Sequence, residues 1–134
     1  MNVIDEAVEA VICMMNGISP FATVTRGALP TGIGITCEVT STMMSEYYLN
    51  KGARIPIDIT LNGKHYDLQV LSDDLNGIHD MLTRIIDPTL YPSGTNWKII
   101  DIVTNVYPHI ISREVNNEWI MASSLIVNLG KKGV

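Results

Sequence analysis

The stretch from Ser72 to Leu129 constrains the fold more than any other part of the sequence. Apolar residues recur at helical spacing from Ser72 to Ile86 before a proline ends the run. Two strongly apolar segments follow, Trp97–Val106 and Glu118–Leu129, and their apolar positions carry no group typical of catalysis. We expect an amphipathic helix followed by two antiparallel strands. This combination is typical of a structural scaffold.

The length of 134 residues suits a single domain, 1–134, and such a chain buries roughly two-thirds of its unfolded surface. Apolar residues make up 46% of the sequence and charged residues only 17%, and the mean hydropathy is +0.20. Both faces of the last two strands are apolar over much of their length, and only two helices are expected to cover them. We therefore predict a homo-oligomer whose subunits bury sheet surface against one another.

The formal net charge is −5, and the nine Lys and Arg residues form no basic stripe. This distribution disfavours direct recognition of nucleic acid, which needs clustered cations to neutralise phosphates. No apolar run approaches the ~20 residues that span a bilayer. The first residues include Asp5 and Glu6, where a signal peptide carries Lys or Arg. We expect a protein that stays in the cytoplasm in which it is made.

The first half of the chain predicts one helix and several strands. An apolar stripe indicates a helix from Val3 to Met15, with Asn2 and Gly17 as caps and Cys13 on the buried face. Alternation predicts a strand over 33–40, a short strand is expected at 21–26, and the segment 40–49 fits either a helix or a longer strand.

The next segment predicts a β-hairpin. Apolar residues alternate from Ile55 to Leu61, the pair Asn62-Gly63 is typical of a type I′ turn, and Lys64–Val70 is expected to return as the partner strand. Pro108 is expected to end the strand that starts at Trp97. The predicted class is α+β: an antiparallel sheet of four to six strands packed against two helices, in the order helix, strands, helix, two long strands.

No catalytic, cofactor-binding or metal-binding residues are predicted. Ser123-Ser124 lies within a strand and lacks the glycines of a nucleophile elbow, and no glycine-rich phosphate loop is present. The two cysteines are most simply buried thiols, and His79 is most simply a structural histidine on the central helix. We expect a protein that is not an enzyme, although a site assembled from dispersed residues is the alternative.

Spaced apolar and turn residues between about 47 and 129 resemble one family. They are Asn50-Lys-Gly, Ile55–Lys64, Leu71–Arg84, Tyr91-Pro92, Trp97–Asn105, Pro108, Glu118-Trp119 and Ser124–Val127. These segments resemble the small minor capsid proteins of tailed phages and prophages in Gram-positive bacteria. That group is similar to the tail-terminator and tail-completion proteins, which share an α+β fold and form hexameric rings.

The resemblance implies a structural virion protein that caps the head-proximal end of the tail tube and joins it to the neck. Its implied partners are further copies of itself, the tail tube protein, a neck or connector protein and, in a contractile tail, the sheath protein. The implied location is the tail–neck junction of a virion assembled in the bacterial cytoplasm. An acidic lumen would let DNA pass through the ring without binding, because like charges repel.

Contact residues are predicted in the loop around Arg26–Thr31, in the expected hairpin and on the last two strands. The candidates are Arg26, Leu29, Thr31, Asn62, Gly63, Ile100, Ile102 and Ile126. Three other functions remain as alternatives. These are a neighbouring head–tail connector or neck protein, a soluble α+β binding module, and a small enzyme with a dispersed site.

Overall fold

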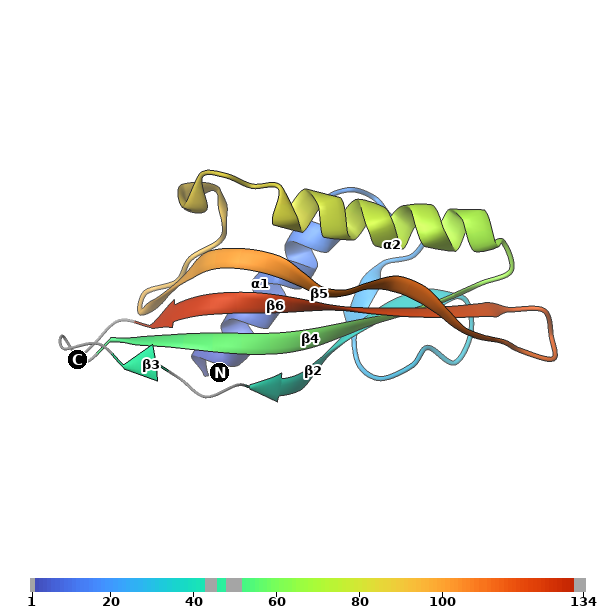
Figure 1. Ribbon diagram of the computed structural model, residues 1–134, viewed down its shortest axis with the longest axis horizontal. Coiled ribbons are helices and arrows are strands. Elements are labelled where there is room, and N and C mark those ends of the chain that lie inside the picture. Colours follow the sequence, from blue (N-terminus) through green and yellow to red (C-terminus); the bar gives the residue numbers. More distant parts are fainter. Residues whose placement is uncertain (1, 43–45, 48–51, 132–134) are drawn as a thin grey trace.

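The computed structural model describes residues 2–42, 46–47 and 52–131. Two helices and six strands confirm the α+β class (Figure 1). In chain order the elements are α1 (Val3–Asn16), β1 (Val24–Arg26), β2 (Gly34–Thr42), β3 (Glu46–Tyr47), β4 (Ala53–His65), α2 (Leu68–Thr83), the 3-10 helix η1 (Pro88–Leu90), β5 (Trp97–Arg113) and β6 (Trp119–Lys131).

The strands form a single mixed sheet in the order β1-β2-β4-β6-β5, with β3 paired to β4. The pairs among β2, β3, β4, β5 and β6 are antiparallel, but β1 runs parallel to β2. The prediction of a purely antiparallel sheet is therefore wrong. The reason is the connection between β1 and β2, which loops back along the sheet before β2 begins, instead of reversing the chain in a tight turn (Figure 1).

Helix α1 has the boundaries that the sequence predicts. The Asn2 side chain accepts a hydrogen bond from the Asp5 backbone N–H at 2.9 Å, and Gly17 caps the other end. The prediction that Cys13 is buried is wrong: this thiol is exposed. It directly follows the buried Ile12, and the turn of about 100° between successive helical residues carries it off the core face.

Helix α2 begins four residues earlier than predicted, at Leu68 instead of Ser72. The carboxylate of Asp67 caps the helix by accepting hydrogen bonds from the backbone N–H groups of Gln69 and Val70, at 2.9 and 3.4 Å. The helix ends at Thr83. The predicted return strand over Lys64–Val70 therefore does not exist, because most of that segment belongs to β4 or to the helix.

The predicted turn at Asn62-Gly63 is wrong as well, because β4 runs straight through it. Asn62 pairs with Thr36 of β2 and Ala122 of β6, and Gly63 is buried in the sheet. A Cβ atom at Gly63 would lie 2.6 Å from the Leu71 side chain of α2. The glycine is present because the helix packs closely against the strand here, and not because the chain turns.

Strand β5 also continues past its predicted end at Pro108 and reaches Arg113. It forms one edge of the sheet, and Pro108 lies within a register shift between Val106 and His109. Proline lacks a backbone N–H, so an edge strand or a bulge tolerates it where a central strand does not. Four register shifts interrupt the pairing of β5 with β6.

The segment 40–49 is a strand where it is described. Strand β2 ends at Thr42 and β3 covers Glu46–Tyr47. Its other residues, 43–45 and 48–49, lie outside the described part of the chain. The described strand residues rule out one continuous helix over the segment.

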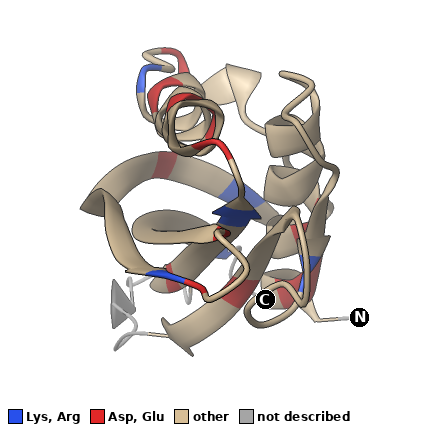
Figure 2. Ribbon diagram, turned by 90° about the vertical axis from the view of Figure 1, so that its right-hand side faces the viewer, with Lys and Arg blue, Asp and Glu red and all other residues tan. Residues whose placement is uncertain are grey.

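Both helices lie on one side of the sheet (Figure 1), and viewed from the end the sheet curls beneath α2 with α1 beside it (Figure 2). The core between them is apolar and continuous. Its largest fully buried side chains are Met15, Ile35, Ile57, Ile59, Leu61, Leu71, Leu75, Ile78, Leu82, Ile99, Ile102 and Leu125.

Candidate interaction surfaces

A buried polar cluster joins α2 to the last two strands. His79 lies on α2, and its Nδ1 atom is 2.9 Å from the Thr104 hydroxyl of β5. Its Nε2 atom is 2.8 Å from the Ser123 hydroxyl of β6. The Tyr107 ring stacks at 6.4 Å between centroids. Each imidazole nitrogen thus has a hydrogen-bonding partner inside the fold.

A serine beside a histidine is the pair used in nucleophilic catalysis, but this pair is sealed. Ser123 and His79 are each only 2% exposed, so no substrate reaches the serine in this conformation. The third member is the Thr104 hydroxyl, where a catalytic triad has a carboxylate to stabilise imidazolium. Burial also lowers the pKa of His79 to about 4, which keeps it neutral at pH 7. The cluster is structural, as the sequence predicts for His79.

Burial also changes the pKa of two other reactive groups of the described chain, Cys37 and Asp58. Burial raises the pKa of the Cys37 thiol to about 12, so it is not a thiolate at neutral pH. Burial raises the pKa of Asp58, whose Oδ1 atom has no hydrogen-bond partner among the described residues. Within residues 2–42, 46–47 and 52–131, no three His, Cys, Asp or Glu side chains are grouped as metal ligands.

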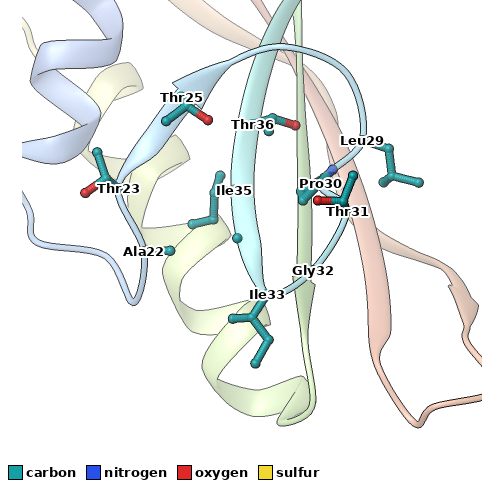
Figure 3. Close-up of a pocket in the computed structure, with 11 residues that line it drawn as sticks. Ala22, Thr23, Thr25, Leu29, Pro30, Thr31, Gly32, Ile33, Ile35 and Thr36 are labelled. Carbon is teal, nitrogen blue, oxygen red and sulfur yellow. The ribbon is translucent and has the colours of Figure 1, made fainter.

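The loop between β1 and β2 encloses a shallow pocket of about 360 Å³ (Figure 3). Leu29, Pro30 and Thr31 of the loop form one side, and Thr25 of β1 and Thr36 of β2 form the other. No charged side chain lines it. The predicted contact residues Leu29 and Thr31 are exposed here. Arg26 is instead engaged within the chain, because its guanidinium lies 2.7 Å from the Asp5 carboxylate of α1.

The predicted contact residues on the last strands are divided by the fold. Ile102 is 2% exposed and belongs to the core of a single chain. Ile100 and Ile126 are half-buried. In the expected hairpin, Gly63 is buried and Asn62 half-buried, so neither forms an exposed turn. The structure therefore does not bring the eight predicted contact residues together in one surface.

A row of exposed apolar side chains follows the edge strand β5, and the sequence reasoning missed most of it. We call it the β5 stripe. Its members are Val103, Val106, Tyr107, Ile110 and Ile111, which are 43 to 71% exposed. The signal that could have found it is the apolar run on both sides of Pro108, read as one edge strand. Pro108 and the register shifts disrupt the row of backbone N–H and C=O groups along this edge. A partner is therefore more readily bound by packing against the side chains of the stripe than by adding a strand to the sheet.

A second apolar surface lies around η1. Ile86 is 95% exposed and Leu90 is 68% exposed. Ile86 was expected on the apolar stripe of the central helix, but that helix ends at Thr83, and Leu90 lies in a segment read as a loop. Beside them a groove of about 360 Å³ separates η1 from the start of β5. Its lining residues are Pro88, Thr89, Tyr91, Ser93, Lys98, Ile99 and Ile100.

Figure 2 shows both basic and acidic segments on this side of the described chain. Neither described helix combines the length and the apolar character that crossing a membrane requires. No family model matches the chain, and no curated protein matches it significantly.

Proposed function

We propose that this protein is a structural virion subunit, a tail terminator. It assembles as a homo-oligomeric ring of six subunits. The ring caps the head-proximal end of the tail tube and joins it to the neck. Its partners are copies of itself, the tube protein and a neck protein. The observation that carries the assembly is the β5 stripe, and the resemblance described above supplies the phage context.

The size of the β5 stripe supports burial by another subunit. The stripe holds five exposed apolar side chains along one sheet edge, and the largest apolar patch of a typical monomer, about 300–600 Å², is often functional. A standard interface buries about 800 Å² on each partner, slightly more than half of it apolar. The stripe can therefore supply part of the apolar area of one such interface.

The chemistry of the chain fits a structural role. The one serine–histidine pair found among the described residues is sealed inside the core, and its partners hold α2 to β5 and β6. The acidic balance, a net charge of −5, also suits a ring through which DNA passes without binding. These features support the proposal because a ring subunit needs surface and rigidity and requires no reactive groups.

The proposal predicts closed rings in solution. We expect negative-stain microscopy of the purified protein to show rings, and light scattering after size exclusion to give one oligomeric mass at tens of micromolar. The double variant Val106→Asp/Ile110→Asp should remain folded by circular dichroism but run as a monomer, because two charges on the β5 stripe cannot be buried without partners.

Ile33→Asp is the matched control, since Ile33 is 47% exposed on the β1–β2 loop and Ile110 is 49% exposed. This variant should still form rings; a loss of rings would place the interface at the loop instead of the stripe. A wild-type protein that stays monomeric in every buffer tried would contradict the assembly. Neighbouring genes that encode no tube or head-completion protein would contradict the phage context.

A further inference from the structure

The turn between β5 and β6 projects an apolar side chain from a braced tip. Val115 is fully exposed. The tip is held by hydrogen bonds from the Glu114 N–H to the Glu118 carbonyl at 2.7 Å and from the Asn117 N–H to the Glu114 carbonyl at 3.0 Å. Asn116 donates a further one to the buried Glu118 carboxylate. A preorganised tip loses little conformational entropy on binding.

The groove beside η1 offers a place for such a side chain. Its floor is apolar, because Ile99 is 1% exposed and Tyr91 is 5% exposed, and the exposed Leu90 belongs to the helix that borders it. The Tyr91 hydroxyl donates to the Leu82 carbonyl of α2 at 2.7 Å, which fixes the ring. The groove and the tip lie at opposite ends of the long axis (Figure 1), so the tip cannot fill the groove of its own chain.

Charges beside the two features are complementary. The tip carries Arg113 and Glu114 directly before Val115. The groove carries Lys98 in its lining and Asp87 at the start of η1. Lys98 is exposed and has no ion pair among the described residues, whereas Glu114 is partly exposed and forms an ion pair with the buried Lys64 at 3.8 Å. A tip placed in a groove can therefore bring the exposed part of Glu114 against Lys98.

We propose that the β5–β6 tip of one subunit docks into the η1 groove of the next subunit, with Val115 in the groove and Glu114 against Lys98. This inference rests on the proposed ring and names its contact. The contact is heterologous, because it joins two different surfaces of identical chains. Such contacts repeat head to tail and close into a ring when the rotation between subunits permits. The β5 stripe adjoins the tip along the chain and is covered by the same neighbour.

Charge reversal tests the contact. We expect Lys98→Glu alone and Glu114→Lys alone each to raise the concentration for half-assembly at least tenfold, because each brings like charges together. The double variant Lys98→Glu/Glu114→Lys should assemble within about threefold of wild type, since the pair is restored with reversed signs. Asn76→Asp, an added charge on the exposed face of α2, should leave assembly unchanged. Because Glu114→Lys also loses the ion pair with Lys64, each variant is first checked for wild-type circular dichroism and urea stability. Failure of a folded double variant to recover would overturn the proposed pairing.

Cross-linking tests the geometry. In a Cys13→Ser background, Val115→Cys/Leu90→Cys treated with a short bismaleimide should give a ladder of covalent multimers, and Val115→Cys/Asn76→Cys should give none. Rings that form without the ladder and are insensitive to charge reversal would refute the contact but leave the proposed function standing. A ladder from open filaments would support the contact and refute the ring. A wild-type monomer would overturn both proposals.

Discussion

Replacing Gly63 with valine is expected to lower the free energy of unfolding by about 2 kcal/mol, the middle of the range for overpacked cores. The reason is the close approach of α2. A Cβ atom at this position would lie 2.6 Å from Leu71 Cδ1 and 3.5 Å from Leu75 Cδ1, and both leucines are fully buried. Valine adds this Cβ atom and two methyl groups, although the space beside Leu71 has no room for the Cβ atom alone.

Urea denaturation of wild type and variant measures this effect, and Gly32→Val is the control. A Cβ atom at Gly32 meets nothing within 4 Å, so that substitution should change stability by less than about 0.5 kcal/mol. Leu71→Ala should couple to Gly63→Val, because the truncated side chain vacates the space that valine needs. Strict additivity of the two substitutions would mean that Gly63 does not face Leu71 and that our account of the glycine is wrong.

This position shows why local sequence signals misled the prediction of β4. Asn-Gly favours a tight turn when only neighbouring residues are considered, because glycine and asparagine tolerate positive φ. In the structure the glycine satisfies a contact with a helix that begins five residues later. Nothing within the strand itself encodes that contact. The alternation of Ile55, Ile57, Ile59 and Leu61 on the buried face was readable, because it depends on the strand alone.

Helix α1 was predictable for the same reason, since its stripe and its Asn2 cap are local. The start of α2 was not, because Asp67 and Ser72 are both acceptable caps. The four residues between them, 68–71, carry no signal that separates the start of a helix from the end of a strand. The structure selects Asp67, whose carboxylate binds two backbone N–H groups.

The interaction surfaces were less predictable than the core. Apolar composition predicted that the last two strands carry more apolar surface than one chain covers. It did not identify which residues are exposed: Ile102 was expected at an interface but is buried, and Ile110 is exposed. Register shifts break the alternation in β5, so Ile102 lies opposite Val127 and is buried, while Ile110 lies opposite Met121 and is half exposed. Whether a residue of β5 is exposed depends on whether a helix extends over it. The alternation of apolar residues along the strand carries no information about where the helices end.

The second large effect is expected at His79, where acid should destabilise the protein. Its pKa in the folded state is about 4, against 6.5 as its ordinary value, because burial disfavours the charged ring. Between these values the unfolded chain binds a proton that the folded chain does not. Stability therefore falls as pH drops from about 6.5 towards 4 and is fully present above pH 7. With about 1.4 kcal/mol for each pKa unit and allowance for solvent screening, the loss is about 2 kcal/mol.

His79→Gln separates this contribution from other titrating groups. Glutamine can hydrogen-bond with Thr104 or Ser123 but does not titrate, so the variant should be less stable than wild type at pH 7 and lose less stability on acidification. Carboxylates such as Asp58, whose pKa burial raises, titrate in both proteins and cancel in the difference. The measurement is the free energy of unfolding in urea at pH 7, 5.5 and 4.5 for each protein.

Parallel pH curves for the two proteins would show that His79 is protonated in the folded state and that the cluster is not sealed. A converging pair of curves would show that His79 stays neutral in the folded state. Thr104 and Tyr107 both contact His79, and Tyr107 is also the most exposed member of the β5 stripe. Loss of the neutral imidazole therefore loosens α2 from the strand that the proposed neighbour covers. We expect rings, where they form, to dissociate over the same pH interval in wild type and to be less sensitive in His79→Gln.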